Sequence, residues 1–196
     1  MSTKSDEIEF WESRYQSGKT PWDFHGVPRA LTSWLHSTES TGRVLIPGCG
    51  SGYEVQAFHS AGWDSIGIDY TPAAVARAKA RLGALADKVV LSDFFTHKFG
   101  PQKFDLIYER TFLCALRPER RPAYATRMAE LLVDGGKLMG FFLYGHEEEP
   151  PPYPLTAEAA RTLFEKNFVR RADEAVGDSL PIFGDRERWQ IWEKVA

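Results

Sequence analysis

The stretch RVLIPGCGSGYE, residues 43–54, decides the fold of this chain. A short apolar run ends in the glycines Gly48, Gly50 and Gly52, spaced G-x-G-x-G, and an amphipathic segment at 53–61 follows. This order predicts a buried strand, a tight turn and the N-terminus of a helix. Glycine suits such a turn because the backbone angles are closed to other residues and because a ligand must lie against bare main chain.

An acidic residue, Asp69, follows at the end of a second predicted strand, 64–68. An acid about 20 residues past a glycine turn binds ribose hydroxyls in nucleoside-binding α/β folds. The turn differs from the dinucleotide pattern G-x-G-x-x-G, and the absence of a following Lys-Ser/Thr pair excludes a P-loop. The combination resembles the loop of class I S-adenosylmethionine-dependent methyltransferases. A structural turn in another α/β protein and an NAD site remain as alternatives.

Strands and helices alternate along the rest of the chain. Strands are predicted at 43–46, 64–68, 88–91, 104–108, 137–144, 168–176 and 188–195, and helices at 53–61, 72–82 (with Thr71 as N-cap), 119–132 and 156–166. The alternation predicts an α/β fold with a mostly parallel sheet of seven strands and helices on both faces. Ligands of such sheets bind beyond the carboxyl ends of the strands, so Asp69, Asp93 and Glu109-Arg110 are expected in one crevice.

The composition is that of a globular enzyme of one domain. The chain has 196 residues, of which 43 % are hydrophobic and 26 % charged. Its net charge of −3 does not indicate a basic surface for binding nucleic acid. The two cysteines are too few for a disulfide framework, and no apolar stretch is long enough for a membrane span. We therefore expect a cytoplasmic protein with a small-molecule substrate, no nucleic-acid or membrane partner, no metal, and a monomeric or weakly dimeric state.

Aromatic residues gather ahead of the glycine turn. Trp11 and Tyr15 are spaced to share one helix face, and Trp22 follows. These rings could pack against the sheet edge, or they could cover a sulfonium cation, which is attracted to ring faces. At the end of the third predicted strand, Asp93 offers an acceptor for an adenine amine and Phe94 an apolar face.

These motifs together resemble the thiopurine S-methyltransferase family, and within it the halide/thiol methyltransferase branch of plants and bacteria. The resemblance keeps order and spacing over most of the chain, and it is carried by residues 10–12, 21–23, 46–50, 93–95, 104–116 and 118–124. It implies a Rossmann-like class I methyltransferase fold and S-adenosylmethionine as the cofactor. The predicted organisation is an aromatic lid at 1–36, a cofactor-binding core at 43–144, and a substrate loop with the last strands at 145–196.

The resemblance also implies roles for single residues. Aromatic side chains would cap the cofactor, the glycines would line its methionine and ribose, Asp69 would bind ribose, Asp93 and Phe94 would bind adenine, and Arg110 would lie near the methionine end. The full set of predicted cofactor-binding residues is Trp11, Tyr15, Trp22, Gly48, Gly50, Gly52, Asp69, Tyr70, Asp93, Phe94 and Arg110. Two positions depart from the branch: Tyr15 replaces a tryptophan, and Arg110 stands where plant members have tyrosine and the thiopurine enzymes have arginine.

The chemistry implied is methyl transfer to a soft nucleophile, for which orientation and exclusion of water suffice and a general base is optional. His146, after the fifth predicted strand, is the candidate base, while Tyr153 and Arg186 are candidate substrate-binding residues. The sequence leaves the acceptor open among thiols, thiopurines, halides and oxyanions of selenium or tellurium. An O- or N-methyltransferase of a small metabolite and a non-catalytic S-adenosylmethionine-binding module are the alternative functions.

Overall fold

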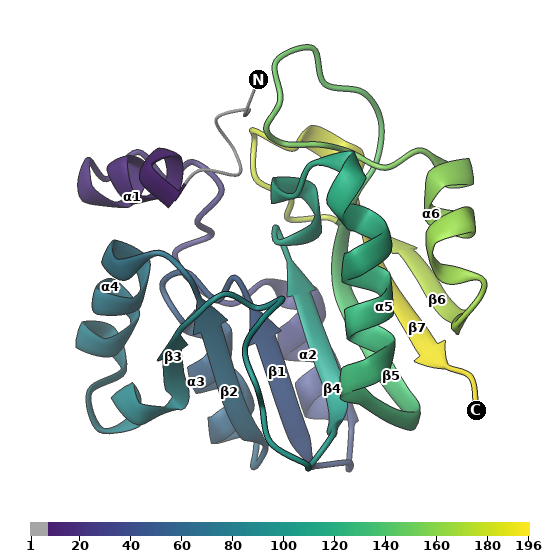
Figure 1. The fold of residues 1–196 in the computed structure, drawn as a ribbon, viewed down its shortest axis with the longest axis horizontal. Coiled ribbons are helices and arrows are strands. Elements are labelled where there is room, and N and C mark those ends of the chain that lie inside the picture. Colours follow the sequence, from purple (N-terminus) through teal and green to yellow (C-terminus); the bar gives the residue numbers. More distant parts are fainter. Residues whose placement is uncertain (1–7) are drawn as a thin grey trace. The chain divides into compact units, whose positions relative to one another are not determined.

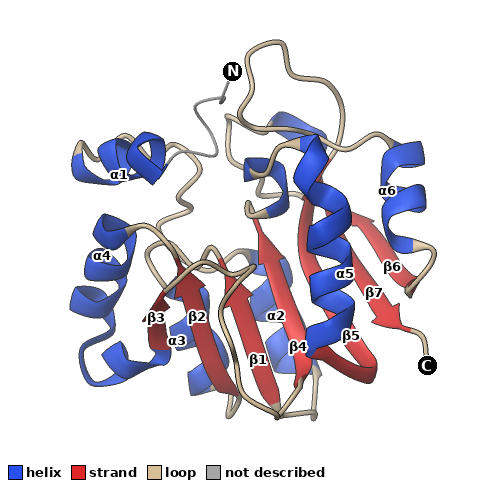
Figure 2. Ribbon diagram, viewed as in Figure 1, coloured by secondary structure: helices blue, strands red, loops and turns tan. Residues whose placement is uncertain are grey.

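The computed structural model describes residues 8–196, so the first seven residues of the predicted lid lie outside the described part. The chain divides into two compact units: the first ends at Phe99, and the second runs from Gly100 to Ala196. Helices and strands alternate in both (Figure 2). The expectation of a single domain stays a prediction. Among residues 8–196, no helix combines the length and the apolar character that crossing a membrane requires.

The first unit contains three parallel strands in the order β3-β2-β1 (Figure 1). Its elements are α1 (Ile8–Gln16), α2 (Arg29–Ser37), β1 (Arg43–Pro47), α3 (Tyr53–Ser60), β2 (Asp64–Asp69), α4 (Pro72–Leu82), the 3-10 helix η2 (Gly83–Lys88) and β3 (Val89–Leu91). Helix α2 was not predicted. The predicted strand–turn–helix–strand unit is present, with its strands one residue longer at their C-terminal ends than predicted.

Helix α3 packs directly on β2 because the strand carries small residues where the helix crosses it. The Ser65 hydroxyl donates a hydrogen bond of 2.9 Å to the carbonyl oxygen of Val55 in α3. A Cβ on Gly67 would lie 2.8 Å from both Cys49 Sγ and Val55 Cγ2. Such close contact fixes the glycine turn, which lies between β1 and α3, against the end of β2.

The second unit contains four strands in the order β4-β5-β7-β6 (Figure 1). Its elements are β4 (Phe104–Arg110), η3 (Leu113–Ala115), η4 (Pro118–Arg120), α5 (Arg121–Leu131), β5 (Leu132–Leu143), α6 (Ala157–Phe164), β6 (Phe168–Ala175), η5 (Gly184–Arg186) and β7 (Glu187–Lys194). Strand β4 is parallel to β5, whereas β7 is antiparallel to both β5 and β6. The expectation of a mostly parallel arrangement is corrected to a mixed one, since β6 and β7 are joined by a loop with no crossover helix.

The core of the second unit is built on aromatic rings. Phe164 of α6 lies 4.8 Å from Trp192, 5.8 Å from Phe142 and 6.4 Å from Tyr124, measured between ring centroids. The predicted helix 119–132 and strand 137–144 are displaced at their shared boundary: α5 ends at Leu131 and β5 begins at Leu132. The pairing of β4 with β5 shifts register between Phe104 and Leu106, and this irregularity accommodates the early residues of β5.

Candidate active site

The glycine turn of the first unit has the backbone conformation that the sequence predicts. Gly48, Gly50 and Gly52 have φ angles of 59°, 49° and 71°, in the region that favours glycine. A Cβ on Gly50 would lie 2.7 Å from the hydroxyl oxygen of Tyr15, so a side chain here would collide with the tyrosine. The turn therefore presents bare main chain next to an aromatic ring.

Asp69, the last residue of β2, is tied to this turn. Its Oδ2 accepts a hydrogen bond of 3.1 Å from the Gly50 amide, and its Oδ1 accepts one of 2.9 Å from the Thr71 amide. Burial raises the pKa of the Asp69 carboxyl, and these hydrogen bonds oppose the rise. The arrangement places a carboxylate beside the main chain of the glycine turn, as the sequence predicts for a residue that binds ribose.

The predicted capping role of Thr71 is only partly right. Thr71 stands at the N-cap of α4, but its side chain makes no capping hydrogen bond to the helix. Instead, Glu12 Oε2 accepts a hydrogen bond of 2.9 Å from the Ala73 amide in the first turn of α4. Helix α1 thus provides the acceptor for α4, and the Thr71 side chain bonds to Asp69.

The aromatic residues of the predicted lid form one cluster. The ring centroid of Trp22 lies 5.2 Å from that of Trp11 and 6.1 Å from that of Tyr15, both in edge-on geometry. Arg77 of α4 donates a hydrogen bond of 2.8 Å to the Tyr15 carbonyl and lies 5.3 Å from the centroid of its ring. Burial and the charge of Asp69 raise the pKa of the Tyr15 phenol, so its hydroxyl stays neutral. The first unit therefore brings the aromatic cluster, Gly50 and Asp69 together.

Asp23 and Arg81, which the sequence analysis did not single out as site residues, also hold the glycine turn in place. The Ser51 hydroxyl donates a hydrogen bond of 2.6 Å to Asp23 Oδ2, which links the turn to the aromatic segment. Arg81 of α4 donates through Nε to the Ser51 carbonyl at 2.8 Å and through Nη2 to the Gly52 carbonyl. Asp23 belongs to the Pro-Trp-Asp run that carries the resemblance and could have been found there. Nothing in the local sequence marks Arg81.

The loop after β3 lies beside Asp69, because the Ser92 amide donates a hydrogen bond of 3.0 Å to the Asp69 carbonyl. The carboxylate of Asp93 already accepts the Phe95 amide at 2.9 Å through Oδ1, and Phe94 is buried. Tyr70 is half-buried next to Asp69 in the chain. Contacts of Tyr70, Asp93 and Phe94 with a cofactor stay predictions.

In the second unit, Arg110 ends β4 and faces a buried carboxylate. Its Nη1 lies 3.6 Å from Oε1 of Glu187, and its guanidinium carbon lies 4.4 Å from the centroid of the Phe141 ring. The side chains of Arg110 and Glu187 are only 8 % and 3 % exposed. The sequence reasoning did not single out Glu187, which no local pattern connects to Arg110. A cofactor contact of Arg110 stays a prediction.

Glu109, the preceding residue, organises the loop after β4. Its Oε1 accepts the amides of Phe112 at 2.8 Å and Leu113 at 2.9 Å, and its Oε2 accepts the Tyr124 hydroxyl at 2.7 Å. Burial raises the pKa of this carboxyl to about 7. Gly140 of β5 permits the close approach, because a Cβ there would overlap the Glu109 carbonyl.

The predicted substrate-binding residues hold loops of the second unit. The Tyr153 amide donates to the Cys114 carbonyl at 2.7 Å, and Arg121 donates to the Tyr153 carbonyl at 2.7 Å. Arg186 donates through Nη1 to the carbonyl of His146 at 2.7 Å. These bonds fix the two ends of the predicted substrate loop. Substrate contacts of Tyr153 and Arg186, and a role of the exposed His146 as a base, stay predictions.

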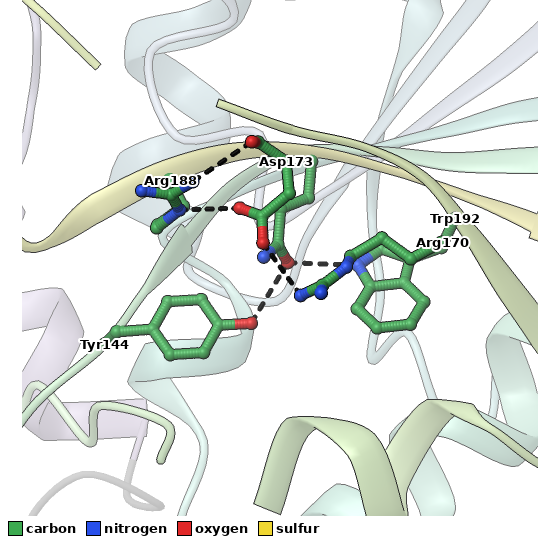
Figure 3. A network of polar contacts seen from close by, with 6 residues as sticks. Tyr144, Arg170, Asp173, Arg188 and Trp192 are labelled. Carbon is green, nitrogen blue, oxygen red and sulfur yellow. Dashed lines mark hydrogen bonds and ion pairs between the residues drawn. The ribbon is translucent and has the colours of Figure 1, made fainter. Parts of the chain in front are cut away.

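Arg188 belongs to a polar network on β6 and β7 (Figure 3). Its Nε lies 2.5 Å from Asp173 Oδ1, and Arg170 Nη1 lies 2.8 Å from the other oxygen of the same carboxylate. The hydroxyl of Tyr144 and the indole of Trp192 both donate to Gln190 Oε1, each at 3.1 Å. This network joins neighbouring strands, and it gives Arg188 an internal partner.

Comparison with known proteins places the chain in a family. Residues 6–191 match the family described as thiopurine S-methyltransferase. A probable thiol methyltransferase 2 of Arabidopsis thaliana is 37 % identical over 94 % of this chain and 84 % of its own length. Thiocyanate methyltransferase 1 of the same plant is 32 % identical over 98 % of this chain and 87 % of its own length.

Among solved structures, a 1,6-didemethyltoxoflavin-N1-methyltransferase of Burkholderia thailandensis matches with a TM-score of 0.76 and 19 % identity, over 96 % of this chain and 87 % of that chain. A magnesium protoporphyrin IX methyltransferase of Synechocystis matches with a TM-score of 0.75 and 14 % identity, over 99 % of this chain and 98 % of that chain. At these identities the likeness concerns the fold alone. It confirms the predicted Rossmann-like fold of class I methyltransferases.

The fold is thus that of a class I methyltransferase. The chain belongs to the thiopurine S-methyltransferase family. The predictions of this family and of a methyltransferase enzyme are confirmed.

Proposed function

We propose that this protein transfers the methyl group of S-adenosylmethionine to a small, soft nucleophile such as a thiol, a thiopurine, thiocyanate or a halide. The observation that carries the proposal is the arrangement in the first unit: bare main chain at Gly50, the carboxylate of Asp69 bonded to it, and the ring of Tyr15 against it. The matched relatives named for thiol and thiocyanate methylation support the acceptor class.

The residues present fit this cofactor. Gly50 has no side chain and a φ angle that favours glycine, so the main chain of the turn is bare where the cofactor would lie. Asp69 would accept hydrogen bonds from ribose hydroxyls, and Asp93 and Phe94 would contact adenine. Trp11, Tyr15 and Trp22 would face the sulfonium, since aromatic rings attract cations. When bound, S-adenosylmethionine supplies a methyl group on a positively charged sulfur that a nucleophile can displace.

The protein's own task is then to bind, orient and exclude water. A thiol with a pKa near about 8.5 is a few per cent ionised at neutral pH, so an acceptor of this class needs no dedicated base. The phenol of Tyr15 stays neutral through burial and serves as a packing surface rather than an acid. The family resemblance assigns Arg110 of the second unit to cofactor binding, and this role stays a prediction.

We include a small-molecule acceptor and a cytoplasmic location in the proposal. Cys49 and Cys114 are free thiols, which suits a reducing compartment.

A direct test uses purified protein and S-adenosylmethionine labelled on the methyl group. The acceptor panel is 2-mercaptoethanol, thiocyanate, iodide and a thiopurine, with a small amine and a small alcohol as negative controls. We expect labelled product from at least one sulfur or halide acceptor and none from the amine or the alcohol. Transfer to the amine or alcohol alone would favour the O- or N-methyltransferase alternative, and cofactor binding without transfer to any acceptor would favour a binding module.

A further inference from the structure

Glu187 is the first residue of β7, and it is a buried carboxylate beside a buried cation. Its side chain is 3 % exposed, and its Oε1 lies 3.6 Å from Nη1 of Arg110. Its Oε2 is buried and has no hydrogen-bond partner among residues 8–196. A carboxylate in this condition requires an explanation, because burying a charge costs free energy unless the charge is paired and hydrogen-bonded.

The sheet determines that these two side chains meet. Arg110 is the partner of Phe141 in β5, and Glu187 is the partner of Leu143 in the same strand. Phe141 and Leu143 are two residues apart and therefore lie on one face of the sheet. The guanidinium of Arg110 lies over the Phe141 ring and reaches across β5 to Glu187.

Glu109 does not take the place of Glu187 in this contact. It precedes Arg110 in β4, so its side chain points to the opposite face. Both of its oxygens are bonded there, to the amides of Phe112 and Leu113 and to the hydroxyl of Tyr124. Among residues 8–196, Glu187 is therefore an acid that pairs with Arg110 on the same face of the sheet.

A contribution to stability is a weak explanation for the Arg110–Glu187 pair. Replacing a buried ion pair by apolar residues of similar size is often neutral or stabilising, so the pair is weak evidence of a stabilising role. Its position at the carboxyl end of β4, where ligands of such sheets bind, points instead to the ligand.

We propose that Glu187 determines the specificity for the methyl acceptor: by neutralising Arg110, it lowers the preference of the enzyme for acceptors that carry a permanent negative charge. This inference rests on the function proposed above. An unopposed guanidinium attracts thiocyanate and iodide, whereas a guanidinium paired with a carboxylate has almost no net charge to offer them. A thiol binds largely as the uncharged acid at neutral pH, and its affinity is nearly independent of the pair.

The test is a cycle of four proteins: the wild type, Glu187→Gln, Arg110→Gln and the double variant. The measurements are KM and kcat for thiocyanate and for 2-mercaptoethanol, together with the rise in Tm that thiocyanate causes in protein saturated with S-adenosylhomocysteine. The Tm measurement reports acceptor binding without turnover. The control is Glu193→Gln, on the same strand, where Glu193 pairs with Arg171 at an exposed site.

We expect Glu187→Gln to lower the KM for thiocyanate about tenfold and Arg110→Gln to raise it about tenfold, with the double variant within about threefold of the wild type. The KM for 2-mercaptoethanol should change less than about threefold throughout, and Glu193→Gln should behave as the wild type. Should Glu187→Gln fail to fold, the double variant must still bind thiocyanate more tightly than Arg110→Gln.

An unchanged ratio of the two KM values in Glu187→Gln, in an enzyme that methylates either acceptor, would overturn this inference alone. So would a change confined to the affinity for S-adenosylhomocysteine, which would assign the pair to the cofactor. Absence of transfer to every acceptor in the wild type would instead overturn the proposed function. In that case the Tm measurement still decides whether Glu187 opposes anion binding.

Discussion

Asp69 is the last residue of β2 in the first unit, and Glu109 is the last residue but one of β4 in the second unit. Both are buried carboxylates, and both accept hydrogen bonds from main-chain amides of the loop that follows the strand. Their second partners differ. The other oxygen of Asp69 accepts the Gly50 amide of a turn with bare main chain, whereas the other oxygen of Glu109 accepts the hydroxyl of the fully buried Tyr124. One acid is bonded to the glycine turn, where we propose that the cofactor binds, and the other is bonded to a tyrosine of the core.

The comparison teaches that the position of an acid at a strand end does not by itself assign its role. The partner of the second carboxylate oxygen distinguishes the two roles. We therefore propose that Asp69 binds the cofactor and that Glu109 holds the loop after β4 in shape. This assignment predicts that changes around Glu109 act mainly on stability and changes around Asp69 act mainly on binding.

The largest effect is expected where β4 and β5 approach most closely. A Cβ on Gly140 would overlap the Glu109 carbonyl, so Gly140→Ala should lower the free energy of unfolding by at least about 3 kcal/mol. Gly135→Ala is the matched control, because Gly135 lies in the same strand with a positive φ but with open space around it, and should cost about 1 kcal/mol. Denaturant unfolding measures both. Equal costs would show that the close approach to Glu109 is unimportant.

The next effect concerns the pH dependence of stability. The Glu109 carboxyl has a pKa of about 7 in the folded protein against 4.5 in its ordinary state, so between these values the native state holds a proton that the unfolded chain has released. Stability from this group is complete below pH 4.5 and falls as the pH rises to about 7, by roughly 3 kcal/mol. In Glu109→Gln this part of the decline should vanish, and the part due to the raised pKa of Asp69 should remain.

Thermal unfolding between pH 4.5 and 8 measures this decline, with Asp64→Asn as the control. The pKa of Asp64 is lowered by its partners Lys88 and Arg43, so its contribution changes only at more acidic pH. A decline as steep in Glu109→Gln as in the wild type would show that Glu109 titrates normally.

A smaller effect is expected on cofactor affinity. Asp69→Ala should weaken the binding of S-adenosylhomocysteine by about 2 kcal/mol, because ribose hydroxyls lose a charged acceptor. Asp64→Ala removes the acid at the other end of the same strand, where it pairs with Arg43 and Lys88, and should leave the affinity unchanged. Titration calorimetry compares the two. If both variants bind equally well, Asp69 does not contact the cofactor.

The glycine turn, Asp69 and the aromatic cluster could be predicted from the sequence because each depends on local spacing. The φ angles of Gly48, Gly50 and Gly52 follow from a turn of this kind, and Trp11 and Tyr15 share a helix face because they are four residues apart. The predicted fold was right for the same reason, since strands and helices alternate visibly along the chain.

The residues that were missed depend on contacts between distant segments. Glu187 meets Arg110 only because β7 runs antiparallel to β5, and that direction was not predicted. Glu12 caps α4, and Arg81 binds the carbonyls of the glycine turn, through packing that no local pattern encodes. The predicted boundary between α5 and β5 was inexact because β5 begins at Leu132, directly after α5 ends at Leu131. The helix and the strand therefore share one short apolar run.

The central claim is that the first unit holds the cofactor at the turn tied to Asp69. Hydrogen exchange measured by mass spectrometry with and without S-adenosylhomocysteine tests it most directly. We predict increased protection in peptides that cover residues 11–23, 48–52 and 69–71, and no change with NAD in place of S-adenosylhomocysteine. Saturating binding that leaves the exchange of all three segments unchanged would contradict the account.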